Sequence, residues 1–246
     1  MIYSLIIFFI VLIIYFHIQG SLKICNDLEL FEFNNVMNYD LKELDKMKQP
    51  LLFSKIDGDI LLHPSLLIKK SNESNDEQFY HSNDLLSISL KSHMLKYDTF
   101  INPGTNDLLK HYDVVCGQKF QTSLKYMFYS RFFIIPVEEP ISIKLTSPSN
   151  SKYLYPNENF ENLKFESEYN PWTTNIPTSN VPFLDITVHP GQYLYIPSYW
   201  WYSIKFMKKT NILLIKYDTL TSIVANSNYY FLGFYSKLKK YIEYTS

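Results

Sequence analysis

The sequence has few of the residues on which several common functions depend. It carries one arginine, Arg131, and only two cysteines, Cys25 and Cys116. A single guanidinium excludes a site built from several bidentate arginine clamps on phosphate or carboxylate groups. Two cysteines exclude a disulfide scaffold or a cysteine-rich zinc module, and we expect both thiols to be unpaired. The formal net charge of −1 excludes a general nucleic-acid binder, which needs an excess of basic side chains.

Aromatic residues, by contrast, are abundant. They make up 17% of the chain, with 21 tyrosines and 18 phenylalanines, and this content excludes a disordered polypeptide. A chain of 246 residues corresponds to one large domain, or at most two small ones. Once the uncharged N-terminal segment is set aside, residues 21–246 still suffice for one all-β or α+β domain with a sizeable core.

The N-terminal segment is the longest apolar run. Residues 1–20 contain no Asp, Glu, Lys or Arg, and Ile2–Ile18 is almost wholly apolar. Its length is close to the minimum that spans hydrocarbon, so we expect a single-pass membrane anchor. A cleaved signal peptide is one alternative, although the basic start and the small-residue cleavage site are missing. A buried core helix is another. The orientation stays open, because Lys23 is the only basic residue near the end of the segment.

Residues 21–118 have a mixed pattern that predicts a region flanking the main domain. Apolar residues at helical spacing predict a helix over 40–49, which Pro50 ends. A polar stretch without periodicity predicts an exposed loop over 69–83. The other elements predicted here are strands over 51–53 and 85–91 and a short helix, capped by Thr105–Asn106, that runs to Tyr112.

Short strands dominate from residue 119 onward. Apolar runs are separated by prolines and by other turn residues, and several such strands at close spacing predict an antiparallel barrel or jelly roll. The strands are predicted over 120–129, 132–137, 141–146, 184–188, 192–196, 200–206 and 212–217. A helix with one apolar face is predicted over 228–244. We therefore divide the chain into an anchor (1–20), a flanking part (21–118), a jelly-roll core (119–220) and a C-terminal amphipathic helix (221–246).

Residues 188–206, VHPGQYLYIPSYWWYSIKF, carry the most specific pattern in the chain. A proline–glycine turn precedes a strand, a second proline and two adjacent tryptophans. At this point the sequence resembles the cupin superfamily, and within it the JmjC-like cupins of the asparaginyl-hydroxylase type. The resemblance implies a double-stranded β-helix, the cupin form of the jelly roll. The residues of the motif that match are Pro190, Gly191, Pro197, Trp200 and Trp201.

Two further stretches support the resemblance. Residues 141–156 are similar to a strand followed by the Leu-Tyr-Pro pattern of these proteins, and Asn170–Trp172 fits at the expected distance. The arrangement of residues 26–33 and 48–53 after an N-terminal anchor looks like a group of membrane-anchored cupin-like proteins of large DNA viruses. The combined resemblance covers roughly residues 28–220, and its specific part runs from 120 to 206.

The resemblance also implies a metal site, and here the sequence departs from the family. Active members hold Fe(II) with a His-x-Asp/Glu pair on one strand and a distal His on another. Tyr126 aligns with the first histidine, Phe128 with the carboxylate and Tyr202 with the distal histidine. The lysine that binds 2-oxoglutarate would fall near Ile141, and Lys144 is off register. The resemblance thus points to degenerate metal-ligand positions.

We therefore expect no metal and no cofactor, with Fe(II) and 2-oxoglutarate bound only if the ligands have moved. A tyrosine binds iron well only as the phenolate, and its reference pKa is about 10. The simplest interpretation is that Tyr126, Phe128 and Tyr202 fill the mouth of the barrel with packed rings. An aromatic-lined pocket for an apolar or sugar-like ligand is the alternative. His189 is expected to be a turn residue rather than a ligand.

Three functions remain open. The first is a non-catalytic, membrane-anchored binding or structural module, a pseudoenzyme that contacts the membrane through residues 2–18. The second is a diverged Fe(II)/2-oxoglutarate hydroxylase or a metal-free cupin enzyme. The third is a viral membrane or virion component that mediates protein contacts. The helix over 228–244 would pack on the barrel, form a homodimer, bind a protein partner or lie on a membrane surface. The resemblance favours a dimer contact, because the C-terminal helices of the resembled hydroxylases dimerise.

Overall fold

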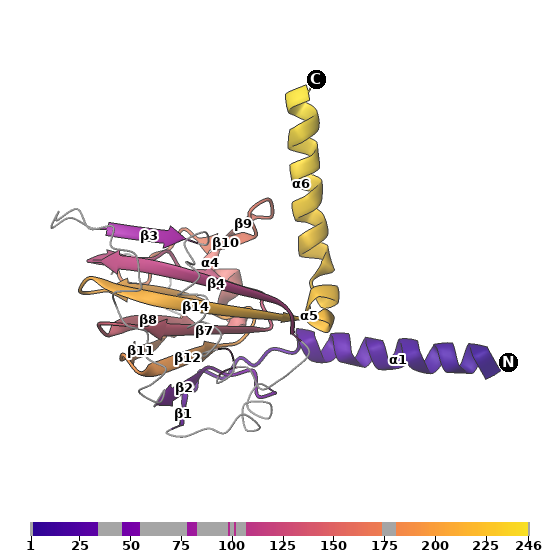
Figure 1. Ribbon diagram of the computed structural model, residues 1–246, viewed down its shortest axis with the longest axis horizontal. Helices are drawn as coiled ribbons and strands as arrows, with labels where there is room; N and C mark the ends of the chain where they lie inside the picture. Colours follow the sequence, from indigo (N-terminus) through magenta and orange to yellow (C-terminus); the bar gives the residue numbers. More distant parts are fainter. Residues whose placement is uncertain are drawn as a thin grey trace.

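The protein folds as two facing β-sheets with helices gathered at one end (Figure 1). The computed structural model describes residues 2–33, 46–54, 78–82, 98, 101, 107–173 and 181–245. A mainly β architecture of two sheets is consistent with the predicted jelly roll. The helix predicted over 40–49 lies mostly outside the described residues, and the strand predicted over 85–91 lies wholly outside them.

The first sheet contains the longest strands, β4 and β14, which lie side by side. Its pairing is antiparallel apart from the short β1–β2 pair, which is parallel. In spatial order its strands are β1 (Phe31–Phe33), β2 (Leu51–Ser54), β12 (Gln192–Ile196), β7 (Arg131–Pro136), β14 (Thr210–Thr219), β4 (Asp107–Gln118) and β3 (Gln78–Ser82).

The second sheet is antiparallel throughout and has β13 near its middle. Its strands in spatial order are β11 (Leu184–Val188), β8 (Ile141–Thr146), β13 (Trp201–Phe206), β6 (Lys125–Tyr126), β10 (Lys164–Ser167) and β9 (Pro156–Asn159), and β5 (Phe120–Gln121) also pairs with β13. Between β8 and β9 lie the 3-10 helix η3 (Pro148–Asn150) and the short helix α4 (Ser151–Leu154).

The main core lies between the sheets because alternate residues of each strand face inward. Ile134 and Leu194 of the first sheet and Ile143 and Ile204 of the second are buried in this inter-sheet core. Each sheet also has a buried cluster on its outer face. The outer cluster of the first sheet includes Phe53, Phe133, Tyr193 and Tyr217. The outer cluster of the second sheet includes Leu124, Tyr126, Phe128, Phe165 and Trp201.

Most strands of the second half were predicted within one or two residues, but three local predictions were wrong. The segment expected to form a capped helix up to Tyr112 is part of β4, which pairs with β14 from Asp107 to Gly117. This long ladder of backbone hydrogen bonds outweighs a local capping signal. Part of the loop predicted over 69–83 forms β3, which pairs with β4. The strand predicted over 120–129 is divided into β5 and β6, because the Thr122 side chain and backbone both bond Ile204.

The helices at the two ends of the described chain leave the same end of the sheets (Figure 1). Helix α1 (Ile2–Leu22) contains an 18-residue window, Tyr3–Gly20, that is long and apolar enough to cross a membrane, and none of that window is buried in the protein. After β14, the short helix α5 (Leu220–Ala225) contacts α1 and is followed by α6 (Ser227–Thr245). The predicted helices at both ends are confirmed as helices, and both cysteines are unpaired.

Candidate functional site

The register of β6 on β13 decides which residues face the space between the sheets. Lys125 lies opposite Tyr202, and Tyr126 lies opposite Trp201. Directly opposed residues of an antiparallel pair share a face, and neighbours along a strand point to opposite faces. Tyr202 belongs to the inter-sheet core, whereas Tyr126 and Trp201 belong to the outer cluster of the second sheet. Lys125 therefore faces inward beside Tyr202.

The three rings expected to fill the barrel mouth consequently do not lie together. The Tyr126 ring stacks on Phe165 at 4.9 Å between centroids, on the outer face. Phe128 lies in the same outer cluster and stacks on Tyr229 at 5.3 Å. The Tyr202 ring instead packs against Phe132 at 5.1 Å within the inter-sheet core. The predicted packing of one aromatic cluster was wrong, because the strand register separates Tyr126 from Tyr202.

Lys125 brings a positive charge into this region. Its Nζ lies 5.6 Å from the centroid of the Tyr202 ring, a favourable cation–π geometry. The lysine makes no hydrogen bond or ion pair with the part of the chain that the structure describes. Burial lowers the pKa of the Lys125 amine to about 8, an effect that Glu166 partly opposes. Glu166 is the residue opposite Lys125 across β10 and β6.

The inner face of the first sheet supplies an ion pair to the same region. Lys216 of β14 lies opposite Phe132, which is in the inter-sheet core, so Lys216 also faces inward. Its ammonium donates to the Asp113 carboxylate, and both side chains are buried. The Lys216 Nζ also lies 5.4 Å from the centroid of the Tyr129 ring. We call Lys125, Tyr202, Asp113, Lys216 and Tyr129 the interior polar cluster.

Electrostatic effects connect the members of the interior polar cluster. Lys216 lowers the pKa of Lys125, and Asp113 raises it. Burial raises the pKa of the Tyr202 phenol well above its ordinary value, and Asp113 adds to this effect. The Tyr202 hydroxyl is completely buried and has no hydrogen-bond partner among the described residues. A buried donor without a partner and an ammonium without a counter-ion both favour a hydrogen-bond acceptor or an anion at this place.

The interior polar cluster does not fit the Fe(II) site that the sequence resemblance implies. Tyr202 does face the interior, but burial holds it as the neutral phenol, which is a poor iron ligand. An ammonium at Lys125 repels a cation, and Asp113 is already paired with Lys216. Among the described residues there is no group of three His, Cys, Asp or Glu side chains that could hold a metal ion.

The framework residues of the motif form the turn before β12 and the connection from β12 in the first sheet to β13 in the second. Gly191 has a φ of +87°, which explains a glycine in this turn, and the Gln192 N–H donates to the His189 carbonyl across it. Pro197 ends β12, and the Trp200 N–H donates to its carbonyl at 3.4 Å. Adjacent tryptophans then diverge, since Trp200 enters the inter-sheet core while Trp201 joins the outer cluster. His189 lies in the turn, as expected.

Sequence reasoning missed four members of the cluster, namely Lys125, Asp113, Lys216 and Tyr129. Lys216 was detectable, because it is a charged residue inside the otherwise apolar strand predicted over 212–217, whereas Asp113 lies in a strand that also carries Lys110 and His111. Lys125 was passed over because the alignment placed its neighbour Tyr126 at the ligand position. Lys144 faces away from the inter-sheet core and pairs with Asp185 at 2.7 Å. This orientation agrees with the prediction that Lys144 is off register with the 2-oxoglutarate-binding lysine.

A comparison with protein families gives a match to the family described as the cupin-like domain, over residues 66–231. The matched range covers more than half of the chain and includes every member of the interior polar cluster. No curated protein matches the chain.

Proposed function

The chain belongs to the cupin-like domain family, and from this premise we propose that it is a membrane-anchored binding or structural module without Fe(II)/2-oxoglutarate chemistry. The interior polar cluster supports the proposal best. Lys125 and Tyr202 lie opposite each other on the inner face of the second sheet, where the resembled hydroxylases would hold metal. The nearby carboxylate of Asp113 is neutralised by Lys216. Such a site favours an anion or a hydrogen-bond acceptor over a cation.

Helix α1 supports the membrane attachment. Its apolar side chains are exposed all along the helix, so they lack the protein contacts that a core helix would have. An apolar helix of this length and composition is most stable when lipid surrounds it. The sequence resemblance to membrane-anchored cupin-like proteins of large DNA viruses agrees with this arrangement. We accordingly propose single-pass attachment through residues 2–18, with the sheets outside the bilayer.

Metal binding by the full chain tests the proposed loss of iron chemistry. The chain, purified in detergent, is loaded anaerobically with Fe(II), then with Mn(II) or Zn(II), and its metal content is measured by elemental analysis after desalting. We expect no stoichiometric metal. A known iron- and 2-oxoglutarate-dependent hydroxylase treated in parallel serves as the loading control. Stoichiometric metal, or 2-oxoglutarate turnover by the loaded chain, would overturn the proposal and favour the diverged hydroxylase.

A further inference from the structure

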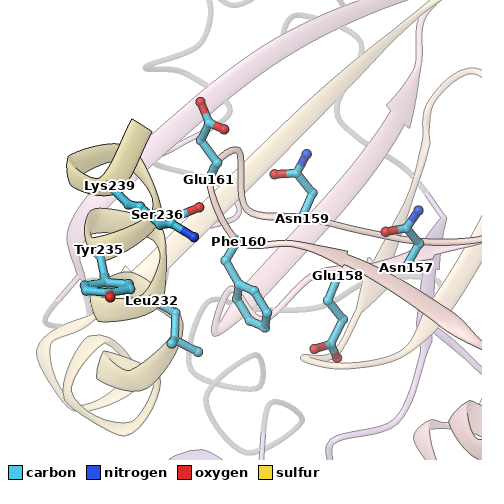
Figure 2. A pocket seen from close by; sticks show the side chains of 9 residues that line it. All are labelled: Asn157, Glu158, Asn159, Phe160, Glu161, Leu232, Tyr235, Ser236 and Lys239. Atoms are coloured by element: carbon cyan, nitrogen blue, oxygen red, sulfur yellow. The ribbon is translucent and has the colours of Figure 1, made fainter. Parts of the chain in front are cut away.

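The side of α6 that faces the sheets is fixed by two contacts. A Cβ on Gly233 would lie 2.6 Å from the carbonyl oxygen of Phe160, so this glycine lets the helix approach the turn between β9 and β10. About two helical turns further along, the Lys240 ammonium pairs with Glu161 at 3.1 Å. A groove of about 400 Å³ lies between the turn and the helix, and Figure 2 shows Phe160 beside Leu232 there.

The opposite side of α6 is a continuous apolar face. Successive helical residues turn by about 100°, which places six large apolar side chains within one third of the circumference, opposite Gly233 and Lys240. Their side chains are between 44% and 69% exposed. We call them the apolar face of α6: Phe231, Phe234, Tyr235, Leu238, Tyr241 and Ile242. Tyr235, at one edge of this face, also lines the groove beside the β9–β10 turn, and the other five side chains are exposed.

Lysines border the apolar face on both sides. By the same rotation, Lys237 falls at one edge of the face and Lys239 at the other, where Lys239 also lines the groove beside the β9–β10 turn. A long lysine side chain at such an edge can lie along apolar surface while its ammonium reaches a polar layer. Phenylalanine and tyrosine rings on one face with lysines at its borders are typical of helices that lie in the interface of an anionic membrane.

The position of α6 matches this composition. Helix α5 contacts α1, and α6 follows α5 directly, so α6 starts where α1 meets the sheets. Figure 1 shows α1 extending away from the sheets while α6 runs across the direction of α1. A bilayer crossed by α1 would therefore run alongside α6. The apolar face points away from the sheets, the side toward which α1 extends.

We propose that α6 is a second membrane contact, which lies in the interface with its apolar face among the acyl chains and Lys237 and Lys239 at anionic headgroups. The proposal rests on the proposed anchoring by α1 for the direction of the bilayer. It also gives the sheets a fixed orientation, because α1 and α6 hold them at two places. A second copy of the chain would cover the apolar face as well, but the two bordering lysines and the continuity with α1 favour lipid.

Site-specific fluorescence on the full chain tests the proposal. In a background of Cys25→Ser and Cys116→Ser, single cysteines at Phe234→Cys and Ser236→Cys carry an environment-sensitive fluorophore. The first lies on the apolar face, and the second is half-buried on the side that faces the sheets. The labelled chains are placed in nanodiscs of phosphatidylcholine with a minority of phosphatidylserine. We expect acyl-chain quenchers to act several-fold more strongly on the label at 234, and aqueous iodide to act more strongly on the label at 236.

A third label, at Ile10→Cys in α1, separates this inference from the proposed anchoring. Lipid quenching at position 10 without lipid quenching at 234 overturns the interfacial helix and leaves the anchor. Lipid quenching at 234 alone supports the helix and overturns the anchor. The label at 234 could instead be protected from iodide without being quenched by lipid. If that protection occurs only in discs that hold two copies of the chain, the apolar face belongs to a dimer and the proposal is overturned.

Discussion

Lys125 carries an ammonium group into a largely apolar space without a described counter-ion. Its only close described partner is the Tyr202 ring, whose quadrupole attracts a cation much less strongly than a carboxylate does. Glu166 and Asp113 stabilise the charge from a distance, and Lys216 and Lys164 oppose them. Folding therefore costs free energy at this residue, a cost that is understandable if the amine serves a ligand.

The first prediction is that Lys125→Met stabilises the protein near neutral pH, by on the order of 2 kcal/mol. The folded-state pKa of about 8 lies below the value for an unfolded chain. Between about pH 8 and about pH 10.4 the unfolded chain binds more protons, so the free energy of unfolding of the native protein rises with pH in this window. Lys125→Met should remove that rise. Urea unfolding in detergent at several pH values measures both effects.

The matched control for Lys125→Met is Lys209→Met, because Lys209 is an exposed lysine in the turn before β14. A surface substitution of this kind should change the free energy of unfolding by less than about 0.5 kcal/mol and leave its pH dependence intact. A loss of stability in Lys125→Met, or an unchanged slope above pH 8, would show that the amine is well solvated or has a strong partner.

The second prediction concerns the buried ion pair of Lys216 and Asp113. Lys216→Met leaves the Asp113 carboxylate buried without its closest cation, which should cost about 3 kcal/mol. The double variant Lys216→Met/Asp113→Leu removes both charges and should regain most of this loss. Urea unfolding of the two single variants and the double variant forms a complete cycle. Additive losses in the double variant would contradict a direct interaction between the two side chains.

At the level of elements, β7, β8 and β11 to β14 were predictable because prolines or polar turns separate their apolar runs, whereas β9 and β10 were not predicted. The limits of β8, β11 and β12 were predicted without error for this reason. β4 was missed because a capping signal at Thr105–Asn106 is local, whereas the partner of β4 is about a hundred residues away in β14. Sequence alone carries little information about such a pairing.

The candidate site was less predictable for a related reason. β6 is only two residues long, so no alternation along it shows which of Lys125 and Tyr126 faces inward. The pairing of Lys125 with Tyr202 on β13 settles that question. An error of one residue in the alignment reverses the face of every side chain in the strand. The resemblance therefore identified the family correctly while placing the interior residue one position away.

The third prediction tests how α6 is held on the second sheet. In Gly233→Ala the new methyl group would overlap the Phe160 carbonyl, so α6 should separate from the β9–β10 turn. Alanine is the better helix former by about 1 kcal/mol, so a loosened helix cannot result from poorer helix formation. Hydrogen exchange measured by mass spectrometry should become faster in α6 and in the turn. Gly20→Ala in α1, where a Cβ meets nothing within 4 Å, is the control, and equal protection in both variants would contradict the contact.

At the scale of the whole molecule, two membrane contacts of different strength should hold one domain. A spanning helix inserts almost irreversibly, whereas an interfacial helix binds reversibly and depends on anionic lipid. The fold places the two proposed contacts together, because β14 ends at α5 beside α1 and the chain continues into α6. The interior polar cluster has members on β4, β6, β13 and β14, so a fixed orientation of the sheets would also fix the orientation of the cluster relative to the membrane.

The fourth prediction separates the two contacts. Full-length chain should stay in vesicles through high salt and alkaline carbonate, while residues 21–246 alone should sediment with anionic vesicles and be released by high salt. Phe231→Ser/Phe234→Ser should abolish vesicle binding by the shortened chain but leave the full chain in the membrane. Met207→Ser is the control, because Met207 is also exposed but lies in the turn between β13 and β14, at the opposite end of β14 from α5. Release of the full chain by salt would show that α1 does not span, and salt-resistant binding of residues 21–246 would assign more than an interfacial role to α6.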